Sequence, residues 1–237
     1  MRNTTITILA AVFIYLSAVA AATEAQAMND NALNAKQQSI VAISALSGAG
    51  DLDKLKTALA QGLDAGLSVN EIKEILVQLY AYAGFPRSLN ALATFQSLME
   101  ERKVGGIHDT EGRMPSPMPV GRTSLEFGTE NQTKLIGQPI GGGIYDFAPA
   151  IDQFLKAHLF GDIFQRDNLD WKNRELATIA MLAATPGVEP QLKGHIGIGM
   201  HNGLTVEELR SAALVVGRTI GRQQGDAMNR LLDGMGK

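Results

Sequence analysis

One spacing constrains this sequence more than any other feature: a segment that begins near Gly50 recurs 137 positions later without a gap. The run 66–71, Gly-Leu-Ser-Val-Asn-Glu, returns at 203–208 as Gly-Leu-Thr-Val-Glu-Glu. Eight residues between 50 and 71 are identical to their partners at this offset: Gly50, Leu55, Lys56, Gly62, Gly66, Leu67, Val69 and Glu71. Chance rarely gives so many identities at one fixed offset. The chain is therefore predicted to be a tandem duplication, with too few and too long copies for a solenoid.

The apolar spacing inside each copy is that of a helix. One stripe at i, i+3, i+4, i+7 and i+11 consists of Ile72, Ile75, Leu76, Leu79 and Ala83. After Pro86 a second stripe is predicted to consist of Leu89, Leu92, Ala93, Gln96 and Met99. Ser68 and Glu71 have the spacing of a capping box at the start of the first of these helices. The prediction is an all-α fold built from two tandem helical repeats.

These patterns divide the chain into four segments. The repeats are predicted at 34–103 and 144–237, and the glycine- and proline-rich stretch 104–143 between them reads as a linker. A segment of this length is long for an idle loop, so it is expected to wrap over the helices and could close a cleft. Both interpretations of 104–143, an irregular surface segment and a cover, remain open.

Residues 1–27 have the features of a secretory signal peptide. Arg2 is followed by an uncharged run from Ile6 to Ala22, and Ala25-Gln26-Ala27 offers a small-x-small cleavage site. The alternative is an uncleaved membrane anchor, because the run approaches the length of a short span. Cleavage is preferred, which predicts an exported protein that is periplasmic in a bacterium and has no membrane contact afterwards.

Composition and charge exclude several classes of function. The net charge is −3, from 21 basic and 24 acidic residues, which is unfavourable for nucleic-acid binding. The chain has no cysteine, so thiolate catalysis, cysteine-ligated metals and disulfides are excluded. None of the four histidines is spaced i, i+4 from another, so no metal site is predicted.

The residue best suited to take part in catalysis is His195. It lies in a glycine-rich apolar helix segment, 192–199, where another group could approach closely. A buried structural histidine and a general acid–base are about equally consistent with this context. The first copy has Ala58 at the matching position, so the fold itself does not require histidine there, which favours a function.

Upstream of His195, three charged residues are candidates for the same site. Arg174 and Glu175 open a helix, and Arg166 lies eight residues before Arg174. An arginine fork suits a substrate carboxylate, although Asp167 or Asp170 could equally occupy it. Glu175 could instead serve only the helix dipole.

A second distinctive run extends from Tyr80 to Arg87. Within it Gly84-Phe85-Pro86 ends one helix and starts the next. Tyr80, Tyr82 and Arg87 near that helix start could bind an anion. The alternative is a helix–helix corner with its tyrosines in the core.

Together these segments resemble the carboxymuconolactone decarboxylase family, of the alkylhydroperoxidase D-like superfamily. The resemblance rests on 160–166, on 169–170 and 174–180, on His195, and on 202–209, and the Tyr82–Pro86 run is similar to the family's next helix corner. The whole resembles a double-domain form. In the peroxidase branch a Cys-x-x-Cys pair precedes the histidine, but here Val188 and Gln191 stand at those positions.

The resemblance implies a lyase that needs no cofactor and acts on a small carboxylated lactone or related ring compound. His195 would then be the general acid–base assisted by Glu175, with Arg174 or Arg166 holding the carboxylate. The alternative is a non-catalytic member of the family that binds a small molecule or acts as a scaffold. Thiol peroxidase activity is excluded by the lack of cysteine.

Two further expectations concern assembly and the site. The continuous apolar run Ala212–Val216 is expected to pack between subunits, and hexameric relatives suggest a homo-trimer of two-repeat chains. The copies have complementary losses, because the first lacks the histidine and the second has Arg222-Gln223 in place of the Phe-Pro corner. We therefore expect His195 to share one composite pocket with the Tyr80–Arg87 corner.

Overall fold

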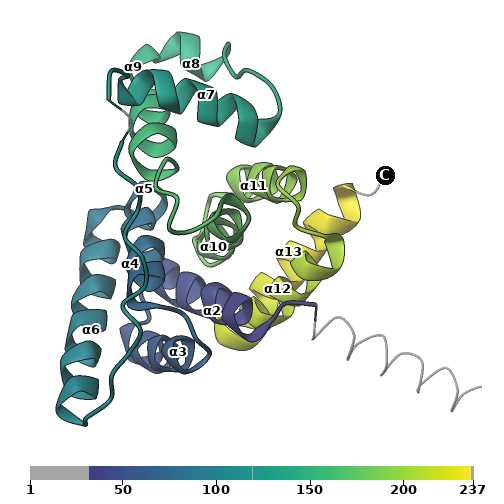
Figure 1. Cartoon of the computed structure of the whole chain (residues 1–237). Helices are drawn as coiled ribbons and strands as arrows, with labels where there is room; N and C mark the ends of the chain where they lie inside the picture. Colours follow the sequence, from purple (N-terminus) through teal and green to yellow (C-terminus); the bar gives the residue numbers. More distant parts are fainter. Residues whose placement is uncertain (1–31, 119, 236–237) are drawn as a thin grey trace, which may run out of the picture.

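The computed structural model describes residues 32–118 and 120–235, so the predicted signal peptide lies outside the described residues. The elements are α2 (Ala35–Ala49), α3 (Leu52–Asp64), α4 (Val69–Gln78), α5 (Tyr80–Ala83), α6 (Phe85–Val104), α7 (Ser124–Ile136), α8 (Ile144–Phe147), α9 (Pro149–Phe154), the π-helix η1 (Leu155–Ile163), α10 (Trp171–Ala183), α11 (Glu189–His201), α12 (Val206–Thr219) and α13 (Arg222–Met235). The described ranges contain no strand, which confirms the all-α prediction (Figure 1).

The duplication seen in the sequence is repeated in the backbone. Gly66 and Gly203 both have φ of +93° in the turns that precede α4 and α12. A side chain is strained at that φ, which explains why glycine stands at both places. Ser68 and Thr205 then cap α4 and α12 with complete capping boxes. The two copies therefore begin corresponding helices by the same local mechanism.

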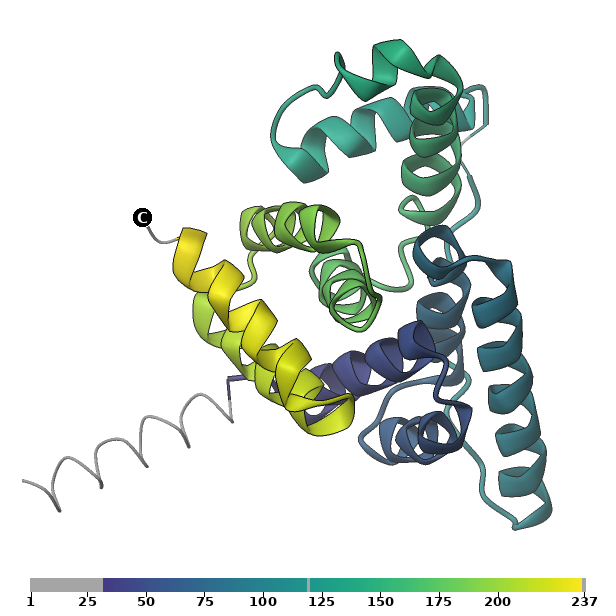
Figure 2. The same ribbon diagram turned by 180° about the vertical axis from the view of Figure 1, so that it is seen from behind.

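The two copies pack together through their first long helices, α2 and α10, in the middle of the molecule (Figures 1 and 2). α10 is buried without interruption from Arg174 to Leu182. Gly48 of α2 allows the close approach, since a Cβ there would lie 2.9 Å from the backbone oxygen of Met181. The two copies consequently share one continuous hydrophobic core.

Of the two predicted apolar stripes, the one in α4 is buried as predicted and the one in α6 is not. Ile72, Ile75, Leu76 and Leu79 are fully buried, as predicted. The stripe predicted for α6 is wrong, because Leu89 is 60% exposed and the buried face instead consists of Ser88, Ala91, Phe95 and Leu98. The reason is rotational phase: the face that α6 turns toward α3, α4 and α2 is offset from the predicted stripe, so part of that stripe is left at the surface.

The expectation that Ala212–Val216 packs between subunits is also wrong. Ala212, Ala213, Val215 and Val216 are buried within a single chain. Their helix, α12, packs between α2 and α13 and so has two apolar neighbours. A continuous apolar run here reflects a helix covered on two sides by its own chain.

The stretch 104–143 contains two kinds of structure. Residues 107–118, called the strap below, run in extended form along α4, where Val69 and Asn70 donate backbone hydrogen bonds to Thr110 and Glu111. The later part forms α7, which has its own capping box at Thr123. α7 packs against η1, and together with α5 and α11 they enclose a second apolar cluster around Phe160 and Phe164.

No helix in the described ranges combines the length and the apolar character needed to cross a membrane.

Candidate active site

The structure places His195 against Glu175. The imidazole Nδ1 lies 2.8 Å from the Glu175 carboxylate oxygen Oε2, across the contact between α11 and α10. The Glu175 side chain is fully buried and that of His195 is 13% exposed. Gly199, one turn after His195, lets α11 approach α10, since a Cβ there would meet Ile179 and Leu204 at 3.0 and 2.8 Å.

The first copy completes this site through Tyr82 of α5. Its ring meets the His195 ring edge to face, with centroids 5.4 Å apart and planes at 82°. Burial, together with the nearby charge of Glu175, raises the pKa of Tyr82 well above its usual value. Tyr82 is therefore a neutral phenol at ordinary pH. Tyr82, one residue of the Tyr80–Arg87 corner, therefore lies beside His195 within one chain.

Several polar atoms around His195 have no protein partner. The buried Oε1 of Glu175 and the buried hydroxyl of Tyr82 accept and donate no hydrogen bond of normal geometry. Thr178, whose hydroxyl accepts from Gln78 Nε2, also lies near enough to lower the pKa of Tyr82. A carboxylate beside Nδ1 favours the tautomer with the proton on Nδ1, which leaves Nε2 for proton transfer. A carboxylate that fixes the imidazole in this way is a common arrangement in general acid–base catalysis.

Arg174 and Arg166 have an internal partner, the carboxylate of Glu74. Arg174 is fully buried and donates from Nη2 to Glu74 at 3.0 Å, while Arg166 donates from Nε and Nη2 at 2.6–3.1 Å. Burial raises the pKa of Glu74, but hydrogen bonds from the two arginines outweigh it and hold the pKa below its usual value. In the described ranges no hydrogen bond joins either arginine to His195.

The sequence analysis missed Glu74, Gln78 and Thr178. Arg174 Nη1 donates to the Gln78 side-chain oxygen at 3.0 Å, and Gln78 Nε2 donates to Thr178 at 2.7 Å. This chain of buried groups runs from the arginine pair to the vicinity of Tyr82. The available signal was that Glu74 and Gln78 stand four residues apart, on one face of a helix rich in apolar residues.

Tyr80 and Arg87 lie on the same corner but have other neighbours. Tyr80 stacks on Phe85 with ring centroids 4.4 Å apart, and its ring centroid lies 5.5 Å from that of His158. Arg87 lies beside Gly50 at the end of α2, and its Nη1 is buried without a hydrogen bond. The structure therefore unites His195, Glu175 and Tyr82, while Arg87 is not hydrogen-bonded to them in the described ranges.

The corresponding place in the first copy lacks the same pair. When α2 and α10 are aligned by their N-cap residues, Asn34 and Asp170, Ser39 of the first copy corresponds to Glu175 of the second. Ala58 of α3 already corresponds to His195. One copy therefore carries the acid–base pair and the other carries two small side chains.

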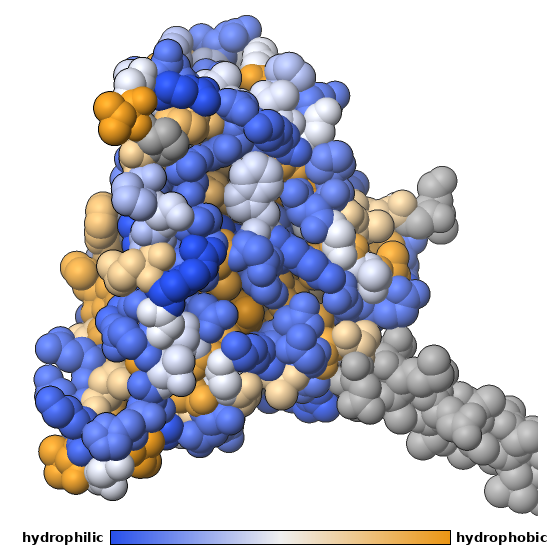
Figure 3. All heavy atoms as spheres, in the orientation of Figure 1, coloured by the Kyte–Doolittle hydropathy of each residue, from blue (hydrophilic) through white to orange (hydrophobic). Residues whose placement is uncertain are grey.

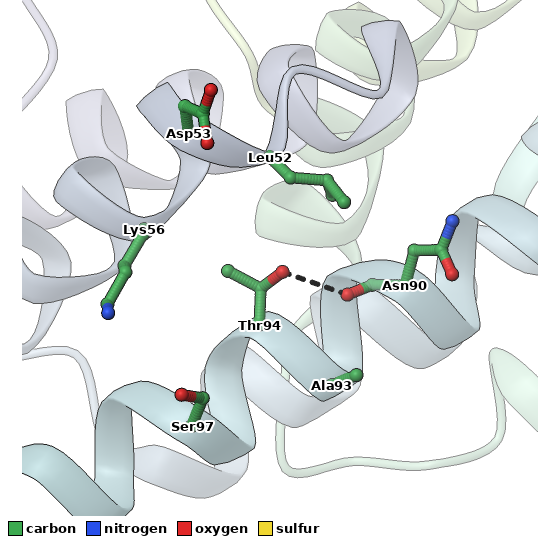
Figure 4. A pocket seen from close by; sticks show the side chains of 7 residues that line it. All are labelled: Leu52, Asp53, Lys56, Asn90, Ala93, Thr94 and Ser97. Atoms are coloured by element: carbon green, nitrogen blue, oxygen red, sulfur yellow. Dashed lines mark hydrogen bonds between the residues drawn. The ribbon is translucent and has the colours of Figure 1, made fainter.

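Two hollows in the described surface lie away from His195. One of about 510 Å³ lies between α3 and α6, with Asp53, Lys56 and Thr94 among its side chains (Figure 4). A second of about 630 Å³ lies between α4, α6 and the strap. Neither includes His195. Within the described ranges no group of three or more histidine, aspartate or glutamate side chains is arranged to hold a metal.

Comparison with known proteins agrees with this architecture. The sequence model of the Carboxymuconolactone decarboxylase family matches residues 15–97 and 149–227, which is more than half of the chain. The search of curated proteins gave no match. The two matched regions each contain one set of the duplicated helices, and the second contains His195 and Glu175. The chain therefore belongs to the carboxymuconolactone decarboxylase family, in a double-domain form.

Proposed function

We propose that this protein is a lyase that needs no cofactor and decarboxylates a small carboxylated lactone or a related ring compound by general acid–base catalysis. The observation that carries the proposal is the His195–Glu175 pair, 2.8 Å apart and closed on one side by Tyr82. Family membership alone supports the coarser statement that the chain has this fold and this ancestry.

The chemistry follows from the free nitrogen of His195. In decarboxylation the bond between the ring carbon and the carboxylate breaks, and its electron pair passes into the lactone system as carbon dioxide leaves. His195 takes part as an imidazolium, protonated from solvent at Nε2 and stabilised by Glu175; it delivers the Nε2 proton to that carbon and returns to the neutral form with the proton on Nδ1. Arg87 is the candidate to hold the substrate carboxylate, because its buried Nη1 has no partner and its helix follows the Tyr82 corner.

The test is turnover of carboxymuconolactone followed by absorbance. His195→Ala should lower kcat at least about 100-fold, and Glu175→Gln by about 10- to 100-fold. His108→Ala is the matched control, because His108 lies exposed in the strap. Activity that survives in His195→Ala would refute the proposed role.

A second candidate is a non-catalytic binding or scaffold protein of the same family. It is favoured by Ser39 and Ala58, which show that the fold persists where the acid–base pair is absent. Under this candidate the unmodified protein does not turn over the lactone but still binds it.

A further inference from the structure

We infer that the hollow between α4, α6 and the strap is a second ligand site, for a small hydroxy acid with an apolar body. This inference goes beyond the proposed function, because the hollow includes none of His195, Glu175 and Tyr82. Its volume of about 630 Å³ lies in the range of small-molecule sites.

The first observation is an amide without a partner. Asn168 lines the hollow and is only 7% exposed, yet both its Nδ2 and its Oδ1 lack a hydrogen bond. Leaving both atoms of a buried amide unpaired is destabilising, because each has lost its hydrogen bonds to water without a replacement. A ligand that accepts from Nδ2 and donates to Oδ1 would remove this cost.

The second observation is the charge beside that amide. Glu74 carries one negative charge and binds two guanidinium groups, those of Arg166 and Arg174, so the cluster has a net charge of +1. Arg166 uses Nε and Nη2 for Glu74, which leaves Nη1 without a hydrogen bond. Lys73 and Glu111, also around the hollow, neutralise each other at 3.0 Å. The local field therefore favours an anion, and a carboxylate fits the free edge of Arg166.

The third observation is the apolar wall. Leu92 and Met99 belong to the stripe that was predicted to lie in the core, but they line this hollow with Phe95, Val77 and Met114. Methionine adapts its shape to varied apolar partners. Leu92 and Met99 thus pack against the core with part of their surface and offer the remainder to the body of a ligand.

The strap closes the outer side of the hollow with Glu111 and Met114. It is fixed at one end to α4 by Val69 and Asn70. At the other end Ser116 donates to both carboxylate oxygens of Asp167, the residue between Arg166 and Asn168. Residues on either side of the ligand are therefore held together before it binds.

The chemistry of these groups defines the ligand. A carboxylate can accept from Arg166 Nη1 and Asn168 Nδ2, and a neighbouring hydroxyl can donate to Asn168 Oδ1. The probes are 3-phenyllactate, 3-phenylpropionate, which lacks the hydroxyl, and 3-phenylpropane-1,2-diol, which lacks the carboxylate. We expect 3-phenyllactate to bind about fivefold more tightly than 3-phenylpropionate and about tenfold more tightly than the diol.

Binding is measured on the full chain by calorimetry and by NMR of methionine methyl groups. The probe should shift the signals of Met99 and Met114 but not those of Met200 and Met235, which line a separate hollow. This measurement needs no variant. Equal affinity for the three probes, or no binding at about 10 mM, would overturn the inference.

Variants then test the named groups. Asn168→Leu and Arg166→Lys should each weaken 3-phenyllactate about tenfold, because leucine removes the amide and lysine removes the fork while keeping a charge for Glu74. Asn90→Leu is the control, because Asn90 lies at the other hollow (Figure 4). His195→Ala should bind 3-phenyllactate unchanged, which separates this site from the proposed active site. Unchanged affinity in both Asn168→Leu and Arg166→Lys would contradict the inference.

Discussion

Replacing Glu74 by glutamine should destabilise the protein more than almost any other single polar substitution. Glu74 is 4% exposed and is the carboxylate that Arg174, with no exposed surface, contacts. The substitution keeps the shape of the side chain but removes the charge, so Arg174 becomes a buried cation without a counter-ion. Arg166 suffers less, because its side chain is 38% exposed and can turn toward water.

The size of the effect follows from this asymmetry. Removing one partner of a fully buried ion pair costs about 3–5 kcal/mol, whereas half-exposed pairs contribute about 0–1 kcal/mol. We therefore expect Glu74→Gln to lower the free energy of unfolding by about 3–5 kcal/mol, nearly all of it through Arg174. Glu101→Gln is the control, since its partner Lys56 and Glu101 itself are exposed, and it should leave the unfolding midpoint unchanged.

The assay is urea unfolding followed by circular dichroism and by the fluorescence of Trp171. Its pH dependence provides a second check. The pKa of Glu74 is lowered in the folded protein, so its contribution is complete above the unfolded pKa of about 4.3 and is lost as pH falls through the folded value. The stability of Glu74→Gln should therefore fall less steeply than that of the unmodified protein below about pH 4. A change of less than about 1 kcal/mol at neutral pH would refute the argument.

Three other outcomes are expected. Gly199→Ala should cost about 1–3 kcal/mol in urea unfolding because its Cβ would meet Leu204 and Ile179, whereas Gly194→Ala, with open space around it, should stabilise α11 by up to about 1 kcal/mol. Hydrogen bonds from Ser116 lower the pKa of Asp167 to about 2, so the strap should stay attached to Asp167 until the pH falls from about 4 toward 2. The substitution Asp167→Asn should release the strap at neutral pH, and tryptic cleavage at Arg113 should then be several-fold faster. Light scattering should give a trimer, and a stable monomer at micromolar concentration would refute the assembly.

The trimer prediction now rests on exposed apolar residues and no longer on Ala212–Val216. Ala212–Val216 is buried in its own chain, but Ile144, Phe147, Ile151 and Phe154 are 67, 89, 43 and 64% exposed along α8 and α9. Hydrophobic surface also gathers at the edge formed by α6, where Phe85 and Leu89 are exposed (Figure 3). Patches of this kind commonly mark interfaces between proteins. These residues are therefore the ones to replace with polar side chains if light scattering shows an oligomer.

Local patterns in the sequence predicted local structure well. The capping boxes at Ser68 and Thr205 and the turns at Gly66 and Gly203 depend on neighbouring residues only, and all four form as the sequence indicates. The prediction of which face of α6 is buried was wrong, because that face depends on which neighbours cover the helix. Periodicity shows that a helix has an apolar stripe, but it does not show whether that stripe faces the core or a hollow.

The candidate site shows the same limit. His195, Glu175 and Tyr82 could be named from the sequence, because histidine and tyrosine stand out in small-residue surroundings. The partner of Arg174 could not, since Glu74 is 100 residues away and belongs to the other copy. A sequence shows that a buried arginine needs a carboxylate, and only the packing of α4 beside α10 shows which one it has.

The position of the polar groups explains how two similar copies came to have one site. At the sequence offset of 137, Glu74, Gln78 and Tyr82 of the first copy correspond to Ser211, Val215 and Thr219 of the second. The polar network therefore joins α4 and α5 of the first copy to α10 and α11 of the second, while among the described residues no ion pair joins α12 to α2 in the related contact. A duplicated helical pair has two such contacts, and one of them is enough for folding when it is filled with core side chains. The other can then carry buried charge and an acid–base pair, because the apolar contact supplies the stability that the polar contact gives up.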